Sequence, residues 1–273
     1  LAASALIAPI SANATPGDSF YDPISISTCQ ELEDIGIDGE TASKFYDLSA
    51  NIDCTGSETW NGGEGFYPIG LNDDFTGGLR GNGFTISNVT INLNDYGVGL
   101  FGATDGANLQ NLNVENIYVN ATSSSEYVGG LIGECTDTTI TDSVVGGYVE
   151  GAYHVGGLVG DSDTCAISGS VSDADVFTQD DNVGGLVGYA ADGTTIINSR
   201  ATGEVTGDGY AGGFIGELYG STIDNSFSTG DVNSSGGSVG GFAAYAEGNS
   251  QISRSYSESD VNANSQEYVG GFI

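Results

Sequence analysis

The sequence predicts an all-β fold, a parallel β-helix or β-solenoid with coils of about 28 residues. A glycine-rich phrase returns as VGGLIG at 128–133, VGGLVG at 155–160 and 183–188, AGGFIG at 211–216, VGGFAA at 239–244 and VGGFI at 269–273, after a looser GVGLFG at 97–102. The large apolar residue of the phrase stands at Leu100, Leu131, Leu158, Leu186, Phe214, Phe242 and Phe272. A unit of this size cannot bury its apolar face alone, so neighbouring units are expected to stack.

Three further columns, of isoleucine, serine and valine, repeat in phase with the glycine phrase. Isoleucine is followed three residues later by serine, and valine comes six residues after the serine: Ile140, Ile167, Ile196, Ile223 and Ile252; Ser143, Ser170, Ser199, Ser226 and Ser255; Val149, Val176, Val205, Val232 and Val261. Glycine disfavours helix and β-branched residues favour strands, so each coil is expected to contain three short extended segments. Equivalent segments should pair in parallel at about 4.8 Å.

The glycine and serine columns have structural explanations. Glycine tolerates positive φ and lets two backbones approach closely at a corner. We expect the serines to form a polar ladder beside a turn, because a nucleophilic serine needs a base within hydrogen-bond reach. The chain has one histidine, His154.

A different block precedes the repeats. In the run Ser27-Thr28-Cys29-Gln30-Glu31-Leu32 a capping residue stands three positions before Gln or Glu, which predicts the start of a short helix. Extended segments are expected at 44–54 and 65–70. We therefore divide the chain into a signal-peptide remnant at 1–14, an N-terminal capping region at 15–70 and repeats at 71–273. Residues 1–14 form an apolar, alanine-rich run that ends in Ala-Asn-Ala, similar to the last part of a secretory signal peptide; a disordered tail is the alternative. The phrase that ends at Ile273 is cut short, so the repeats are expected to be truncated there.

The chain is strongly acidic. Its 273 residues include 37 Asp and Glu but 4 Lys and Arg, a formal net charge of −33. Nucleic-acid binding needs cationic side chains to neutralise phosphates, so nucleic acid and anionic membranes are not expected partners. The sequence also lacks an apolar run long enough for a membrane span.

Four cysteines are expected to form disulfides if the chain is exported: Cys29, Cys54, Cys135 and Cys165. Zinc is the alternative, but there is no C-x-x-C and His154 has no partner histidine. Cys165 lies three positions beyond the repeat equivalent of Cys135, and three extended residues span about 10 Å. A Cys135–Cys165 bridge therefore requires a turn that folds the chain back.

Several phrases follow one another in a specific order. They are YDLSANIDC at 46–54, FYPIG at 66–70, FTGGLRGNGFTISNVTI at 75–91 and VGLFG at 98–102, before the VGGLIG and VGGLVG copies. In this order they resemble the GLUG-repeat family of exported bacterial and archaeal surface proteins, over nearly all of the chain after Thr28. The resemblance implies a right-handed parallel β-helix, capped by a helix-and-strand block, in large adhesin-like proteins; the general rule for parallel crossovers also favours this hand.

The resemblance transfers no catalytic residue. Some members of the family, immunoglobulin-A-specific metallopeptidases, carry such repeats beside a zinc peptidase domain, whose H-E-x-x-H motif is absent from this sequence. It transfers glycines as structural motif positions: Gly129, Gly130, Gly156, Gly157, Gly184, Gly185, Gly212, Gly213, Gly240 and Gly241. No cofactor is expected.

Acidic and aromatic residues allow three further interpretations. The doublets Asp73-Asp74 and Asp180-Asp181, with Asp161 and Asp163, are interpreted as solvated turns; the alternatives are an adventitious calcium site or a two-carboxylate polysaccharidase. Adjacent strand residues point to opposite faces, and no Arg or Lys cluster for an acidic sugar is apparent. Tyrosines before the glycine phrases pack a turn or stack on sugar rings: Tyr127, Tyr153, Tyr210 and Tyr268. Sequons at Asn88, Asn120 and Asn233 permit glycosylation.

The function predicted from these features is non-enzymatic. We expect a secreted or cell-surface, adhesin-like β-solenoid that serves as the stalk or binding face of a larger protein, with an unknown protein or glycan partner at the cell surface. The alternative is an accessory repeat region of a secreted peptidase, or a β-helix carbohydrate-active enzyme.

Overall fold

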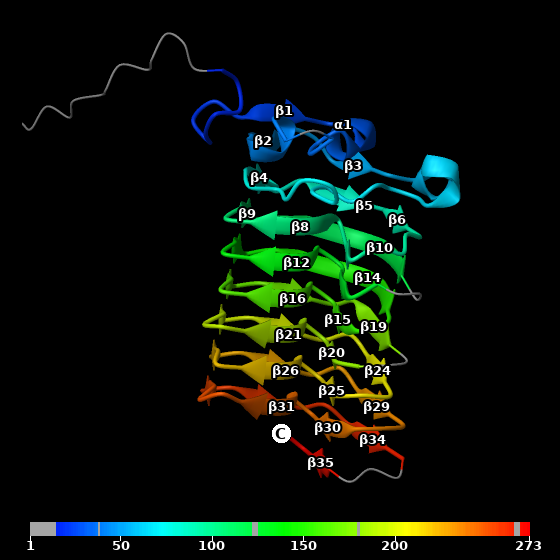
Figure 1. The fold of residues 1–273 in the computed structure, drawn as a ribbon, viewed down its shortest axis with the longest axis vertical. Helices are drawn as coiled ribbons and strands as arrows, with labels where there is room; N and C mark the ends of the chain where they lie inside the picture. Colours follow the sequence, from blue (N-terminus) through cyan, green and yellow to red (C-terminus); the bar gives the residue numbers. More distant parts are fainter. Residues whose placement is uncertain (1–14, 38, 122–124, 179–180, 265–267) are drawn as a thin grey trace, which may run out of the picture.

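A computed structural model describes residues 15–37, 39–121, 125–178, 181–264 and 268–273. The expected signal-peptide remnant at 1–14 lies outside these residues. The chain forms one stack of parallel coils that runs from the N-terminal block to the C-terminal strands (Figure 1). Equivalent strands of neighbouring coils pair in parallel, which confirms the predicted all-β solenoid.

Four sheets run along the stack, here named A to D. Sheet A contains β1 (Ile24–Ile26), β2 (Phe45–Leu48), β4 (Gly78–Arg80), β9 (Asn108–Gln110), β13 (Thr139–Thr141), β17 (Ala166–Ser168), β22 (Thr195–Ile197), β27 (Thr222–Asp224) and β32 (Gln251–Ser253). Sheet B contains β3 (Ile52–Asp53), β5 (Thr85–Ser87), β6 (Thr90–Ile91), β10 (Asn113–Ala121), β14 (Val144–Gly151), β18 (Val171–Ser172), β19 (Asp175–Thr178), β23 (Arg200–Ala201), β24 (Val205–Gly207), β28 (Phe227–Ser228), β29 (Val232–Ser234), β33 (Tyr256–Ser257) and β34 (Val261–Ala263).

The glycine phrases supply the other two sheets. Sheet C contains β8 (Phe101–Asp105), β12 (Ile132–Thr136), β16 (Val159–Asp163), β21 (Val187–Ala191), β26 (Ile215–Tyr219) and β31 (Ala243–Glu247). Sheet D contains β7 (Gly97–Val98), β11 (Tyr127–Gly129), β15 (His154–Gly156), β20 (Val183–Gly184), β25 (Ala211–Gly212), β30 (Ser238–Gly240) and β35 (Tyr268–Gly270). The structure thus divides each coil more finely than the three expected segments, because each phrase bends between a strand of sheet D and a strand of sheet C.

The core consists of stacked identical positions. The column Leu100, Leu131, Leu158, Leu186, Phe214 and Phe242 is fully buried. Its aromatic members lie face to face, with ring centroids 4.6 Å apart for Phe214 and Phe242. The isoleucine column from Ile140 to Ile223 is buried under sheet A. Each fully buried side chain of this size contributes about 1.5 to 3 kcal/mol.

Two columns of left-handed residues turn the coils. Between sheets C and A stand Gly106, Asp137, Thr164, Asp192, Gly220 and Gly248, and between sheets A and B stand Asn111, Asp142, Gly169, Asn198, Asn225 and Arg254. Their φ angles lie between 47° and 69°. Gly, Asn and Asp adopt this conformation at little cost. The polar letters between the apolar columns are therefore the corners of the solenoid.

The N-terminal block caps the stack. Its helix α1 (Cys29–Glu33) begins as predicted, since the Thr28 side chain accepts the Glu31 N–H and the Glu31 carboxylate accepts the Thr28 N–H. Three 3₁₀ turns follow at η1 (Thr41–Ser43), η2 (Ser57–Thr59) and η3 (Asn61–Gly63). Strands β1 and β2 extend sheet A, so the block is joined to the repeats by parallel pairing.

Candidate functional site

The motif glycines lie where backbones approach each other closely. A Cβ on the first glycine would meet the carbonyl oxygen three residues ahead, at 1.9 Å between Gly156 and Val159. A Cβ on the second would meet the next coil, at 2.5 Å from the oxygen of Gly185 for Gly157. None of the ten glycines has positive φ. Close approach therefore requires them, and the expectation of a left-handed backbone at these positions is wrong.

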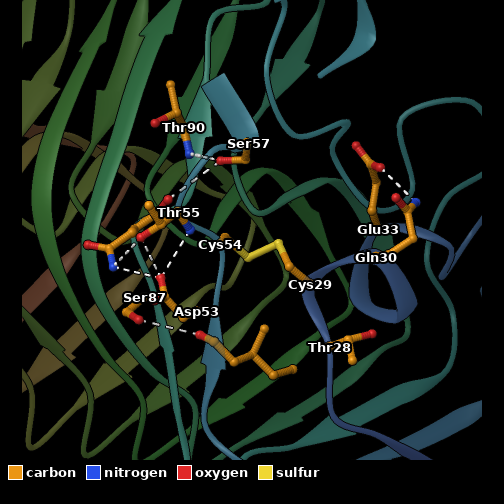
Figure 2. The surroundings of a disulfide bond; sticks show 12 residues. Thr28, Cys29, Gln30, Glu33, Asp53, Cys54, Thr55, Ser57, Ser87 and Thr90 are labelled. Atoms are coloured by element: carbon orange, nitrogen blue, oxygen red, sulfur yellow. Dashed lines mark hydrogen bonds between the residues drawn. A yellow bond between two sulfur atoms is a disulfide. The ribbon is translucent and has the colours of Figure 1, made fainter. Parts of the chain in front are cut away.

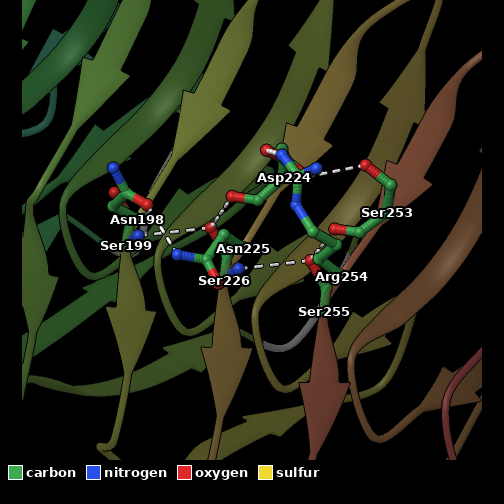
Figure 3. Close-up of polar contacts among 8 residues, drawn as sticks. All are labelled: Asn198, Ser199, Asp224, Asn225, Ser226, Ser253, Arg254 and Ser255. Atoms are coloured by element: carbon green, nitrogen blue, oxygen red, sulfur yellow. Dashed lines mark hydrogen bonds and ion pairs between the residues drawn. The ribbon is translucent and has the colours of Figure 1, made fainter.

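The serine column forms a ladder with the backbone. The Ser199 hydroxyl accepts the Ser170 N–H at 3.2 Å and donates to the Ile197 carbonyl at 3.0 Å. The same two bonds recur at Ser170, Ser226 and Ser255, and Figure 3 shows the rungs from Ser199 to Ser255. Each hydroxyl satisfies one donor and one acceptor at a buried corner, so the column is structural.

Both cysteine pairs are bonded in the structure. Cys29 opens α1, and its Cα lies 5.3 Å from that of Cys54, which follows β3 (Figure 2). The Cα atoms of Cys135 and Cys165 lie 6.4 Å apart. The required fold-back occurs at Thr164, whose φ of 57° turns the chain between sheets C and A.

The outward face of sheets C and D carries an aromatic–acidic strip. We define it as Tyr96, Tyr127, Glu134, His154, Asp161, Asn182, Tyr189, Glu217 and Tyr245. Along sheet C, Glu134 pairs in register with Asp161, Asp161 with Tyr189, and Glu217 with both Tyr189 and Tyr245. On sheet D, Tyr127 pairs with His154. Successive coils therefore present rings and carboxylates in two adjacent columns.

Four rings of the strip, Tyr96, Tyr127, His154 and Tyr189, form a chain of contacts, edge to face for the first pair and stacked for the others. The Tyr96 and Tyr127 centroids are 4.7 Å apart with their hydroxyls at 3.0 Å, and Tyr127 lies 5.4 Å from His154. His154 lies 4.9 Å from Tyr189 in turn. Such contacts hold aromatic side chains in one orientation, so the strip is a preformed surface.

Carboxylates are concentrated in the strip. The Nδ1 of His154 lies within hydrogen-bond distance of the Oδ2 of Asp161, at 2.7 Å. Burial, reinforced by Asp161, raises the pKa of Glu134. Burial also raises the pKa of Glu217, against the opposing hydrogen bond from Asn182. Groups shifted by burial and neighbouring charge mark candidate functional sites.

Asn182 adds an unpaired acceptor. Its side-chain nitrogen donates to Glu217 at 3.0 Å. Its Oδ1 is buried and has no hydrogen-bond partner among the residues that the structure describes. A buried acceptor without a donor costs about 1 to 3 kcal/mol.

The predicted tyrosines fall into different settings. Tyr127 belongs to the strip. Tyr153 lies one position out of register, because His154 faces Tyr127. Tyr210 packs beside Tyr245 at 5.7 Å, and Tyr268 is exposed on the last strand. The repeated phrase already aligns residue 154 with residue 127, so this signal could have identified His154 as a member of the column.

The predicted acidic groups are also separated. Asp73 and Asp74 are exposed, and Asp180 lies outside the described residues. Asp161 and Asp163 share one face of β16, where burial raises the pKa of Asp163. Over the described ranges, no three His, Cys, Asp or Glu side chains are placed to hold a metal ion. Sequence reasoning missed Glu134 and Glu217, since the repeated letters do not mark them.

Two sequons can be placed in the structure. The Asn88 side chain donates to Asp53 and accepts from Asn116, and the Asn233 side chain donates to Glu204. The sequon at Asn120 extends to residue 122, outside the described part of the chain. In the same described part, no helix is long and apolar enough to cross a membrane.

Comparisons with known proteins place this fold in context. A family model, the GLUG motif, matches residues 181–206 and 207–233. Halomucin of Haloquadratum walsbyi is 36% identical over 200 residues, which cover 71% of this chain and 2% of halomucin. An immunoglobulin A1 protease of Streptococcus pneumoniae is 28% identical over 170 residues, 60% of this chain and 8% of that protein. The chain therefore corresponds to a small part of these relatives.

A solved structure shows the same architecture. An IgA1 protease matches with a TM-score of 0.59 over 92% of this chain and 20% of that chain. At 19% sequence identity the match shows a likeness of fold alone.

Proposed function

Because this chain belongs to the GLUG-repeat family, we propose that it is a non-catalytic, extracellular β-solenoid region of a larger surface protein. In this proposal residues 15–70 cap the stack, residues 71–273 form a stalk, and residues 1–14 are the remnant of an export signal. The disulfides support the extracellular place, because they persist in oxidising compartments.

The aromatic–acidic strip carries the binding part of the proposal. It combines stacked rings and carboxylates on the outward face of sheets C and D. Aromatic faces and hydrogen-bond acceptors suit a partner rich in donors, such as the hydroxyls of a glycan or the amides of a protein. The stalk would therefore hold this face towards a surface glycan or protein, in the manner of an adhesin.

A defined glycan array and a panel of purified secreted proteins test the proposal. The strip variant Tyr127→Ala/Tyr189→Ala should lower binding about tenfold or more, because it removes two rings of the strip. The matched control is Tyr118→Ala/Tyr148→Ala, which removes a stacked pair from sheet B. Equal loss in both variants, or no loss in the strip variant, would contradict a binding role for the strip.

The same array tests the absence of catalysis. Bound glycans should be recovered with unchanged mass. Turnover that Asp161→Asn abolishes would instead favour a β-helix carbohydrate-active enzyme.

The similarity to immunoglobulin A1 proteases favours one alternative, an accessory repeat region of a secreted peptidase. The full-length protein distinguishes the two. A zinc peptidase domain with H-E-x-x-H in the same polypeptide would support the accessory region, whereas a cell-wall sorting signal would support the surface stalk.

A further inference from the structure

Cationic side chains are rare in this chain, and three of the four are neutralised. Lys44 lies 2.8 Å from Asp18, Arg80 lies 2.7 Å from Asp47, and Arg254 contacts Asp224. The exposed Arg200 has no ion pair or side-chain hydrogen bond among the described residues. In a protein with 37 acidic residues, this guanidinium remains available to an outside anion.

Stacking brings Arg200 into a pocket with a second arginine. The pocket is lined by Asn198, Arg200, Asn225, Phe227, Arg254 and Tyr256. Arg200 pairs in register with Phe227, and Phe227 with Tyr256. The pocket therefore contains two of the three arginines of the chain, of which Arg254 contacts Asp224. Residues 54 positions apart line the same pocket, because each coil returns the chain to the same face.

The pocket also offers neutral donors. At the corner beside it, the Asn225 amide nitrogen donates to the Asn198 Oδ1 at 2.7 Å (Figure 3). This bond fixes the Asn198 carboxamide and leaves its N–H groups without a partner among the residues described here. The Tyr256 hydroxyl also has no hydrogen-bond partner among the described residues. Amide and hydroxyl donors of this kind pair with the ring and hydroxyl oxygens of sugars.

Aromatic rings form the apolar wall of the pocket. Phe227 and Tyr256 lie 5.0 Å apart and nearly parallel, at 6°. Phe227 is partly buried, whereas Tyr256 is 48% exposed. The rungs of Arg200 and Tyr256 are two coils apart, about 10 Å at the usual strand spacing. This length accommodates one or two sugar rings.

We propose that this arginine pocket binds a carboxylated sugar unit of a glycan. Arg200 would pair with the carboxylate, because a guanidinium binds carboxylate with two parallel hydrogen bonds. Asn198 would donate to sugar oxygens, and the Phe227–Tyr256 wall would cover the apolar edge of the ring. A neutral sugar would leave Arg200 unpaired, so the acidic sugar is preferred. The pocket lies where sheet A meets sheet B, away from the strip on sheets C and D, so either proposal can fail without the other.

Isothermal titration in about 0.15 M salt tests the pocket, since screening then limits repulsion by the acidic surface to about 8 Å. The probes are a glucuronate-containing disaccharide, its neutral glucose counterpart and acetate. The acidic disaccharide should bind at least about tenfold more tightly than either of the others. Equal binding of the neutral disaccharide would overturn the role of the carboxylate, and equal binding of acetate would overturn sugar recognition.

Variants locate the site. Arg200→Gln should weaken the acidic disaccharide about tenfold, and Arg200→Lys less, because lysine keeps the charge but loses the two-pronged geometry. Lys44→Gln is the control, since it changes net charge equally in the capping region. Equal effects of Arg200→Gln and Lys44→Gln would overturn the pocket in favour of overall charge. Unchanged melting temperatures establish that each variant is folded.

Discussion

At the residue scale, the repeated glycines are required because a side chain at these positions would clash with neighbouring backbone atoms. In the five phrases from 128 to 244 the first glycine faces its own coil and the second faces the next coil. The large apolar residue that follows fills the core directly beside them, as Leu158 does after Gly157. The phrase therefore combines the closest backbone approach with the deepest side chain, which explains why both letters recur together.

Gly156→Ala should destabilise the solenoid. Its Cβ would lie 1.9 Å from the Val159 oxygen, so the corner must open. Overpacking of this kind costs about 1 to 3 kcal/mol or more. Gly146→Ala is the control, because the nearest atom to its Cβ lies 3.7 Å away. Urea unfolding followed by circular dichroism should separate the two, and equal midpoints would refute the close-approach explanation.

The ionisation of Glu134 predicts how the stability of the protein depends on pH. Burial raises its folded pKa above the unfolded value, so its ionisation opposes folding. Glu134→Gln should therefore increase the free energy of unfolding at neutral pH. The gain should disappear as the pH falls through the folded pKa towards the unfolded value of about 4.3. Urea unfolding at a series of pH values measures this difference.

Glu31→Gln provides a control of opposite sign. Hydrogen bonds from Ser27 lower the pKa of Glu31, so this variant should lose stability at neutral pH. If Glu134→Gln also loses stability there, the carboxylate makes a favourable contact and its pKa is not raised.

At the scale of elements, side-chain hydroxyls complete the strand ladders at the corners. Between sheets A and B the strand backbone turns away, and the serine hydroxyls replace the missing backbone partners. A second ladder between sheets C and A includes Thr138 and Thr194, and Cys165 takes the place of a hydroxyl between them. The second disulfide is therefore inserted into an existing corner ladder.

Ser199→Ala should be costly for so small a change. It leaves the Ser170 N–H without its partner at a buried corner, whereas the Ile197 carbonyl still accepts the Gly169 N–H. The expected loss is about 1 to 3 kcal/mol. Ser168→Ala is the matched control, since the Ser168 hydroxyl makes no hydrogen bond among the described residues. Thermal and urea unfolding of both variants measure the difference; equal stabilities would show that water replaces the serine hydroxyl.

At the scale of the whole molecule, the stack is held together between neighbours along one axis. Each coil contacts the coil before and the coil after it, so the ends depend on their caps. At the N-terminal end the Cys29–Cys54 bridge joins α1 to sheet B, over the apolar end of the stack.

Replacing this bridge by Cys29→Ala/Cys54→Ala should loosen the cap first. The bridge closes a loop with a sequence separation of 25 residues, for which a stabilisation of about 2 to 4 kcal/mol is typical. Hydrogen exchange should accelerate in α1, β1 and β2 while β21 and β26 stay protected. Uniform acceleration along the chain would instead show that the solenoid unfolds as a single unit. Mass spectrometry of non-reduced peptides from the native source should find Cys29 and Cys54 linked.

The sequence by itself determined the period, the buried column from Leu100 to Phe242, the corner ladder of serines and the capping-box helix, because each depends on letters that repeat or on local hydrogen bonds. The tertiary structure decided which different letters share a face. His154 meets Tyr127 and Tyr189, Glu134 meets Asp161, and Arg200 meets Phe227 only because parallel register stacks unlike residues of successive coils. The left-handed corner at Thr164 likewise brings Cys165 back to Cys135. A sequence repeat shows where each coil begins. Which side chains of neighbouring coils touch depends on the angle of each corner, and that angle is set only in the folded chain.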